Sequence, residues 1–206
     1  MEHSNILMQS RPYLSSALFL DRDGVMIEDV HYISDPKYVK LCPGVKPLIK
    51  HARKTKCLIV VITNQSGIAR GLFNWDTYHR VNDRLLQLLG PEAKISAIYA
   101  NGHGPNAPLS SWRKPSPGML VAAAKDLNID LSRSILVGDR LSDIQAGANA
   151  GLPLLIHVLT GHGKQEQIVV KIWAKRYQLI KTNSCFKFAQ INSLLDFPFE
   201  ELQQLT

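Results

Sequence analysis

Five short runs of apolar residues, separated by segments with helical spacing, constrain the fold of this chain more than any other feature. The runs are rich in Ile, Val and Leu and cover residues 17–20, 57–62, 95–99, 134–137 and 152–158. Continuous apolar runs of this length are typical of strands that are buried on both faces, as in a parallel sheet. We therefore predict that these five runs are the strands of one parallel sheet.

The segments between the runs carry apolar residues at the spacing of amphipathic helices. A polar residue that suits an N-cap, Asn74, precedes one of them, and Gly151 follows another as a C-terminal stop. The tail from about residue 186 indicates one more strand and a short terminal helix. Strands that alternate with helices predict an α/β fold with a parallel sheet. The predicted helices cover residues 45–54, 75–89, 117–127 and 143–150.

A polar side chain directly follows three of the predicted strands. These residues are Asp21, Thr63 and Asp139. Ligands of parallel α/β sheets bind beyond the carboxyl ends of the strands, so the three side chains are expected to meet in one crevice. Any one of them alone is explained equally well as the cap of the following helix. Their common position at strand ends favours a shared site.

Carboxylates are concentrated in two of these segments. Asp21 and Asp23 are two residues apart, and Asp139 and Asp143 follow the fourth apolar run. Clustered carboxylates repel one another unless a cation lies among them or one of them takes up a proton. A set of hard oxygen ligands favours Mg²⁺ over Zn²⁺. The sequence therefore predicts a magnesium site.

Charge and cysteine content restrict the other classes of protein. The formal net charge is +7, but the basic residues are dispersed, and the densest run, 171–181, has the spacing of an amphipathic surface helix with a solvated basic face. Three scattered cysteines, Cys42, Cys57 and Cys185, predict neither a disulfide framework nor a cysteine zinc site. We expect a cytoplasmic protein without a signal peptide, a membrane segment or a nucleic-acid partner.

Four motifs occur in order along the chain. They are DRDG at 21–24, TNQSG at 63–67, RKP at 113–115 and GD at 138–139 followed by Asp143. Together they resemble the haloacid dehalogenase (HAD) superfamily of phosphotransferases, which implies a Rossmann-like fold, here without a large cap domain. Residues 17–160 are similar to the subgroup of bacterial heptose 1,7-bisphosphate phosphatases, which shares its motifs with histidinol-phosphate phosphatases.

The resemblance implies four catalytic residues. Asp21 attacks phosphorus and forms an aspartyl-phosphate. Asp23 protonates the leaving oxygen and then takes a proton from water. Thr63 donates a hydrogen bond to a phosphoryl oxygen, and Lys114 offsets negative charge on the nucleophile and on the transferred group.

The resemblance also implies the metal and substrate sites. Mg²⁺ is held by Asp21, Asp139 and the backbone carbonyl of Asp23, and Asp143 orients Lys114 or a metal-bound water. The planar guanidinium groups of two arginines suit a second phosphate or the substrate hydroxyls, with a surface ion pair as the alternative. The predicted substrate-binding residues are Asp29, His31, Tyr32, Asn64, Gln65, Ser66, Arg113 and Arg140.

One segment departs from the pattern of the subgroup. Many relatives carry a zinc loop of three cysteines and a histidine before the RKP motif, but residues 99–112 contain no cysteine. Ala100, Ser110 and Trp112 stand where thiolates are expected, and His103 alone cannot supply four tetrahedral ligands. We predict no structural zinc. His157 and His162 show no partner pattern that indicates catalysis.

Four functional readings follow, in order of preference. The first is a phosphatase for a sugar bisphosphate, most simply the 7-phosphate of D-glycero-D-manno-heptose 1,7-bisphosphate. The second is the same chemistry on histidinol phosphate or another small metabolite. The third is a nucleic-acid-end phosphatase, and the fourth is a binding domain without activity. We expect a monomer, with residues 1–16 as an N-terminal extension and 17–206 as one phosphatase domain.

Overall fold

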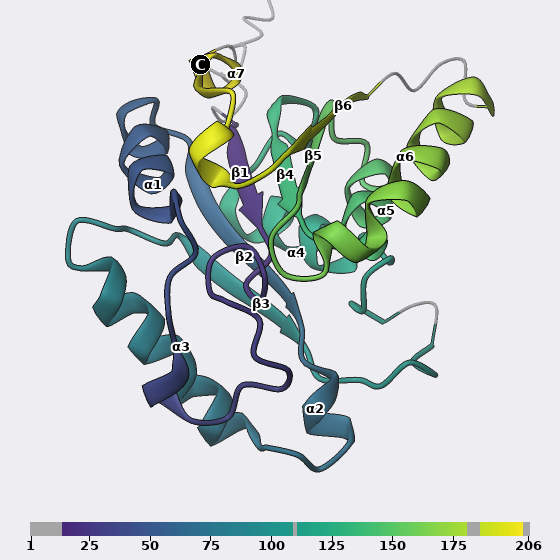
Figure 1. The fold of residues 1–206 in the computed structure, drawn as a ribbon. Coiled ribbons are helices and arrows are strands. Elements are labelled where there is room, and N and C mark those ends of the chain that lie inside the picture. Colours follow the sequence, from purple (N-terminus) through teal and green to yellow (C-terminus); the bar gives the residue numbers. More distant parts are fainter. Residues whose placement is uncertain (1–13, 109–110, 181–185, 204–206) are drawn as a thin grey trace, which may run out of the picture.

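A six-stranded parallel sheet forms the centre of the computed structural model, which describes residues 14–108, 111–180 and 186–203. The strand order is β3-β2-β1-β4-β5-β6, so β1 lies inside the sheet between β2 and β4 (Figure 1). The strands are β1 (Ala17–Leu20), β2 (Leu58–Asn64), β3 (Ala97–Asn101), β4 (Ile135–Gly138), β5 (Leu154–Val158) and β6 (Lys187–Ile191).

The residues of β1, β4 and β5 are buried along their whole length, as the apolar runs predict. Alternate side chains of β1 enter the two halves of the core: Leu18 and Leu20 pack on one face, and Phe19 packs on the other. The predicted strand over 95–99 lies two residues later, because β3 pairs in register with the end of β2. Ala100 is opposite Thr63 there.

Helices cover both faces of the sheet. Helices α1, α3 and α7 pack on one face, and α4, α5 and α6 pack on the other (Figure 1). The α-helices are α1 (Val45–Lys54), α2 (Ser66–Ala69), α3 (Trp75–Leu89), α4 (Gly118–Leu127), α5 (Leu141–Asn149), α6 (Gly163–Ile180) and α7 (Phe199–Gln203). The part of the chain that the structure describes also has three short 3₁₀ helices, η1 (Pro36–Tyr38), η2 (Leu131–Arg133) and η3 (Leu194–Asp196).

The basic run near the C-terminus lies, up to Ile180, in α6, as its helical spacing predicts. Val170 and Ala174 are buried against the sheet, and Trp173 packs beside them. Ile172, next to Trp173, is 48% exposed. The contact with the sheet sets the rotation of the helix, and this information is absent from the spacing of the run itself.

The strand order reverses at β1. The connections through α1 and α3 place β2 and β3 on one side of β1, and the later strands return to the other side. The carboxyl ends of β1 and β4 therefore border the crevice that such a reversal opens. Among the described residues, no helix is long and apolar enough to cross a lipid bilayer.

The predicted N-terminal extension, 1–16, falls mainly outside the described residues. Its end is part of the fold, because Ser15 donates a backbone hydrogen bond to the carbonyl of Asn128 at 2.9 Å. The boundary between extension and domain stays a prediction.

Candidate active site

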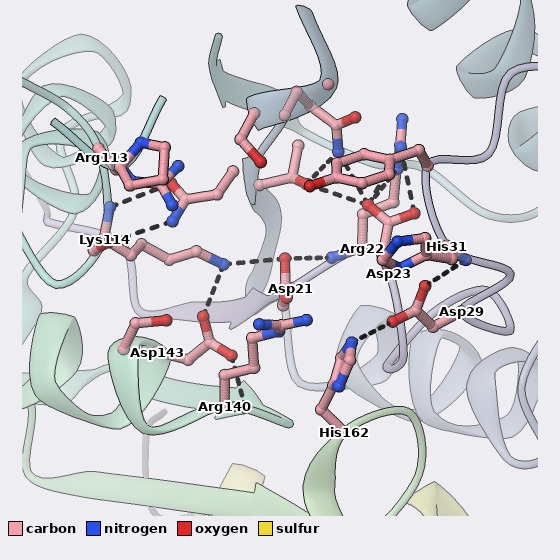
Figure 2. A pocket seen from close by; sticks show the side chains of 18 of the residues that line it. Asp21, Arg22, Asp23, Asp29, His31, Arg113, Lys114, Arg140, Asp143 and His162 are labelled. Carbon is pink, nitrogen blue, oxygen red and sulfur yellow. Dashed lines mark hydrogen bonds and ion pairs between the residues drawn. The ribbon is translucent and has the colours of Figure 1, made fainter. Parts of the chain in front are cut away.

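A pocket of about 500 Å³ lies at the carboxyl ends of the central strands (Figure 2). It brings together all but one of the predicted site residues, and the exception, Asp139, is fully buried directly beside Asp21. The predicted residues that line the pocket are Asp21, Asp23, Asp29, His31, Tyr32, Thr63, Asn64, Gln65, Ser66, Arg113, Lys114, Arg140 and Asp143.

Lys114 is a buried cation that lines this pocket. Its Nζ lies 2.9 Å from Asp21 Oδ1 and 2.7 Å from Asp143 Oδ1, as Figure 2 shows, and it donates to the carbonyl of Ile62 at 3.2 Å. Burial alone lowers the pKa of Lys114, but the charges of Asp143 and Asp21 outweigh it and raise that pKa above its usual value. The lysine is therefore charged at neutral pH and is held between two carboxylates.

Asn64 holds the backbone on which Lys114 stands. Its Oδ1 accepts from the Lys114 N–H at 3.0 Å, and its Nδ2 donates to the Lys114 carbonyl at 3.1 Å. Asn64 thus orients the backbone of Lys114 with one N–H and one oxygen lone pair of its amide. Its predicted substrate contact stays a prediction.

Three buried carboxylates form a cluster, and two of them, Asp21 and Asp143, line the pocket. Ligand oxygens of Asp21, Asp139 and Asp143 lie within 4.8 Å of one another. Burial raises the pKa of Asp21 to about 7, with Lys114 acting against the shift. Burial and the charges of Asp143 and Asp21 raise the pKa of Asp139 to about 9. The three acids cannot all be charged here without a compensating cation.

One oxygen of this cluster has no partner. Asp139 Oδ2 accepts from the backbone N–H of His162 at 2.7 Å, while Asp139 Oδ1 is buried and has no hydrogen-bond partner among the described residues. A buried, unpaired carboxylate oxygen is costly unless a cation binds it. The donor set consists of hard oxygens, which fit Mg²⁺.

The glycine of the first motif is required by this packing. Gly24 has a φ of +84°, and a Cβ at this position would lie 2.3 Å from Asp139 Oδ2. Any side chain at position 24 would therefore displace the Asp139 carboxylate, which is a candidate ligand for a cation.

The raised pKa values predict how metal removal changes stability. Aspartate in the unfolded chain has a pKa of about 3.9, so the metal-free fold binds more protons than the unfolded chain between about pH 4 and pH 9. Its stability must fall as pH rises through this window. We expect the Tm in EDTA to fall from pH 5 to pH 8.5, and Mg²⁺ to raise it most at the alkaline end. If Tm plotted against pH gave parallel curves with and without Mg²⁺, the raised pKa values of Asp21 and Asp139 would be contradicted.

Thr63, Gln65 and Asp23 form a second hydrogen-bonded group at the pocket wall. Gln65 Nε2 donates to Thr63 Oγ1 at 2.7 Å and to Asp23 Oδ2 at 2.8 Å, and Thr63 Oγ1 lies 3.4 Å from the same carboxylate oxygen. Gln65 is only 4% exposed. Its side chain therefore links the other two residues, and the predicted substrate contact of Gln65 stays a prediction.

The wall beyond Lys114 is cationic. Arg113, Arg140 and Arg70 all line the pocket, and Arg113 Nη1 donates to the carbonyl of His103 at 3.0 Å. Burial lowers the pKa of Arg113, and the neighbouring charges of Arg140 and Arg70 lower it further. Three guanidinium groups that repel one another form a site for an oxyanion. Sequence reasoning missed Arg70, which follows α2 and has no motif of its own.

Two histidines, which the sequence left without partners, have partners in the fold. His162 Nε2 lies 2.8 Å from Asp29 Oδ2, and both residues line the pocket (Figure 2). His157 is fully buried, with Nε2 3.0 Å from the carbonyl oxygen of Asp139 and Nδ1 2.8 Å from Gln190 Nε2. These partners are far away in the sequence, so no local pattern predicts them.

Side chains hold the segment that lacks the zinc-loop cysteines. The rings of Tyr99 and Trp112 meet edge to face at 5.8 Å, and Asn101 Oδ1 accepts from the backbone N–H of His103 at 3.0 Å. Position 110 lies outside the described residues. The absence of structural zinc stays a prediction.

Comparison with known proteins places this site in a family. A family profile described as HAD-hydrolase-like matches residues 111–179. A D-glycero-beta-D-manno-heptose-1,7-bisphosphate 7-phosphatase from Mesorhizobium japonicum is 49% identical over 143 residues, which are 66% of this chain and 66% of that protein. A D-glycero-alpha-D-manno-heptose-1,7-bisphosphate 7-phosphatase from Burkholderia mallei is 40% identical over 143 residues, 66% of this chain and 76% of that protein.

A solved structure shares the fold over nearly the whole chain. The D,D-heptose 1,7-bisphosphate phosphatase from B. bronchiseptica, crystallised with magnesium and phosphate, has a TM-score of 0.74 and 30% identity, covering 93% of this chain and 99% of its own. The chain belongs to the HAD-like phosphatases. It is a phosphoric monoester hydrolase.

Proposed function

We propose that this chain removes the 7-phosphate from D-glycero-D-manno-heptose 1,7-bisphosphate, through an aspartyl-phosphate on Asp21 and with Mg²⁺. One observation carries the proposal. The carboxylate that is paired with Lys114 shares a pocket with Arg70, Arg113 and Arg140, so one phosphate can react while a second one is bound. The names of the relatives agree with such a substrate.

The first step forms a bond between phosphorus and a carboxylate oxygen of Asp21. The bond between phosphorus and the sugar oxygen breaks, and Asp23 gives its proton to that oxygen. Lys114 lies 2.9 Å from Asp21 and offsets the repulsion between the anionic carboxylate and the anionic phosphate. In the second step Asp23 takes a proton from water, which attacks phosphorus and releases phosphate from Asp21.

Asp21, Asp139 and the backbone carbonyl of Asp23 would hold Mg²⁺. The unpaired, buried Asp139 Oδ1 supports this assignment, as does the raised pKa of the Asp139 carboxyl, which burial causes. When bound, the cation supplies positive charge that lowers the electrostatic barrier between nucleophile and phosphate. Asp143 Oδ1 lies 2.7 Å from Lys114 Nζ. This contact holds the lysine in place, and the carboxylate balances part of the positive charge of the lysine and the bound cation.

The arginine wall also discriminates between candidate substrates. Histidinol phosphate presents an ammonium group beyond its phosphate, and three guanidinium groups would repel it. A second phosphate gains bidentate, charge-assisted hydrogen bonds at the same place. The charge of the wall therefore favours a bisphosphate.

Loss of one wall arginine is expected to weaken binding of the bisphosphate specifically. Arg113→Ala removes a charged hydrogen-bond donor, so we expect KM for the bisphosphate to rise about 10-fold or more. Turnover of the corresponding 7-monophosphate should change much less. Arg80→Ala, at an exposed position of α3 outside the pocket, is the matched control. Equal losses on both substrates would contradict a second-phosphate site.

A substrate panel tests the proposal as a whole. Phosphate release would be measured with Mg²⁺ and with EDTA on both anomers of heptose 1,7-bisphosphate, fructose 1,6-bisphosphate, histidinol phosphate and a 5′-phosphorylated oligonucleotide. A Mg²⁺-dependent preference for one heptose anomer is the expected result. Faster release from histidinol phosphate or from the oligonucleotide would assign the same chemistry to a different substrate.

A further inference from the structure

Arg22 stands between the two aspartates of the first motif, and neither the motif chemistry nor the proposed mechanism gives it a role. Its side chain is among the largest that are fully buried, with 1% of the residue exposed. Burial of an arginine is costly unless its charge is paired and its N–H groups are bonded. The contacts of Arg22 therefore indicate what the site gains from it.

The guanidinium of Arg22 contacts both oxygens of the Asp23 carboxylate. Nε lies 3.2 Å from Asp23 Oδ2, and Nη2 lies 3.2 Å from Oδ1 and 3.1 Å from Oδ2, as Figure 2 shows. Such a fork fixes the plane of a carboxylate as well as its position. Gln65 and Thr63 approach the same Asp23 Oδ2, at 2.8 Å and 3.4 Å.

Helix α3 in turn fixes Arg22. Its Nη1 donates to Asn82 Oδ1 at 2.8 Å, and its Cζ lies 5.2 Å from the centre of the Tyr78 ring. Asn82 and Tyr78 are 6% and 4% exposed, and neither lines the pocket. A helix outside the pocket thus holds the arginine rigidly, and the arginine holds Asp23.

We propose that Arg22 is a positioning residue that fixes the carboxylate of Asp23 for both of its proton transfers. The inference rests on the proposed function, because it assumes that Asp23 is the acid and the base. Asp23 Oδ2 receives donors from Arg22, Gln65 and Thr63, whereas Oδ1 receives only Arg22 Nη2 among the described residues. The geometry therefore makes Oδ1 the oxygen that exchanges the proton. A guanidinium does not give up its own proton at working pH, so Arg22 orients Asp23 without replacing it.

The first test replaces the guanidinium of Arg22, which contacts both oxygens of Asp23, by the single ammonium group of a lysine. Arg22→Lys keeps the positive charge but cannot bridge both oxygens. We expect kcat on the sugar bisphosphate to fall about 30-fold, within the range of general acid–base catalysis, and KM to change less than about threefold. Arg80→Lys, at an exposed position of α3, is the matched control. An unchanged kcat, or a loss confined to KM, would overturn the inference.

The leaving group separates positioning from a general structural defect. p-Nitrophenolate is a weak base that departs without a proton, so its release in the first turnover should not need Asp23. We expect Arg22→Lys to slow that first-turnover release less than about threefold while sugar bisphosphate turnover falls about 30-fold. Equal losses on both substrates would mean that Arg22 supports the site as a whole.

A double-variant cycle tests whether Arg22 acts through Asp23. If it does, Arg22→Lys should cost less than about twofold in an Asp23→Asn background, because the group that it positions is gone. An equal loss in both backgrounds would overturn this inference and leave the proposed function intact. Full activity of Asp23→Asn alone would instead refute the acid–base role in the proposed function, and this inference with it.

Asn82→Ala provides a milder route if Arg22→Lys does not fold. It removes the acceptor that fixes Nη1 and leaves the Arg22–Asp23 pair in place. We expect kcat to fall about 3- to 10-fold, as for loss of one hydrogen bond, with first-turnover p-nitrophenolate release preserved. Asp83→Ala, an exposed neighbour on α3, is the control. Activity of Asn82→Ala equal to that of this control would contradict the role of α3.

Discussion

Replacement of Asp21 by Asn is expected to lower phosphate release by about 10⁴-fold or more, because the amide cannot form the aspartyl-phosphate. The fold should survive the change. Burial raises the pKa of Asp21 to about 7, so its charge is already unfavourable in the metal-free protein, and its removal relieves repulsion with Asp139 and Asp143. We expect a Tm in EDTA that is equal to or higher than that of the unmodified protein.

The two readouts of Asp21→Asn must be taken on the same preparation. Asp83→Asn, at an exposed position of α3, controls for the loss of one aspartate charge. Activity of Asp21→Asn within 100-fold of the unmodified protein, with the mass confirming that the amide has not reverted, would refute the nucleophile. A large fall in Tm would show that the carboxylate has a structural role.

Replacement of Lys114 by Met is expected to remove activity and to destabilise the protein together. Lys114 is 3% exposed, and its Nζ contacts Asp21 and Asp143 at 2.9 and 2.7 Å. Its loss leaves two buried carboxylates without their cation, and breaking a buried pair in this way costs about 3–5 kcal/mol. Urea unfolding in EDTA measures the change in the free energy of unfolding. Lys125→Met, exposed on α4, is the control.

The destabilisation by Lys114→Met should depend on pH in a definite direction. Lys114 acts against the raised pKa of Asp21, so without the lysine the pKa of that carboxyl rises further, and the folded variant binds more protons than the unmodified protein. The deficit relative to the unmodified protein should therefore be larger at pH 8 than at pH 5.5. A deficit that is independent of pH would mean that lost packing, and not uncompensated charge, is the cause.

The sequence predicts the centre of this fold better than its edges. The bounds of β1, α1 and α3 agree with the apolar runs and the helical spacing, because those residues are buried on the faces that the spacing implies. The bounds of β3 depend on pairing with β2, where Ala100 and Asn101 meet Thr63 and Asn64. Hydropathy cannot place polar strand residues such as Thr63, Asn64 and Asn101 in a strand.

The same distinction holds in the site. Asp21, Thr63 and Asp139 converge because the ends of parallel strands must meet, which the sequence pattern reveals. The contact between Arg22 and Asn82 joins residues 60 positions apart, on a strand end and a helix, and no motif encodes it. Asn64 belongs to a motif from which we predicted a substrate contact. In the fold, its side-chain amide is hydrogen-bonded to the backbone of Lys114. Motifs locate the site, but long-range hydrogen bonds decide what each side chain does in it.

The most direct test of the central claim is ³¹P NMR of heptose 1,7-bisphosphate during turnover, with Mg²⁺ and with EDTA. We predict that the 7-phosphate signal disappears while inorganic phosphate appears and the 1-phosphate signal remains, and that EDTA stops the reaction. Loss of the 1-phosphate first, or an undiminished rate in EDTA, would contradict the assignment of substrate and metal to this pocket.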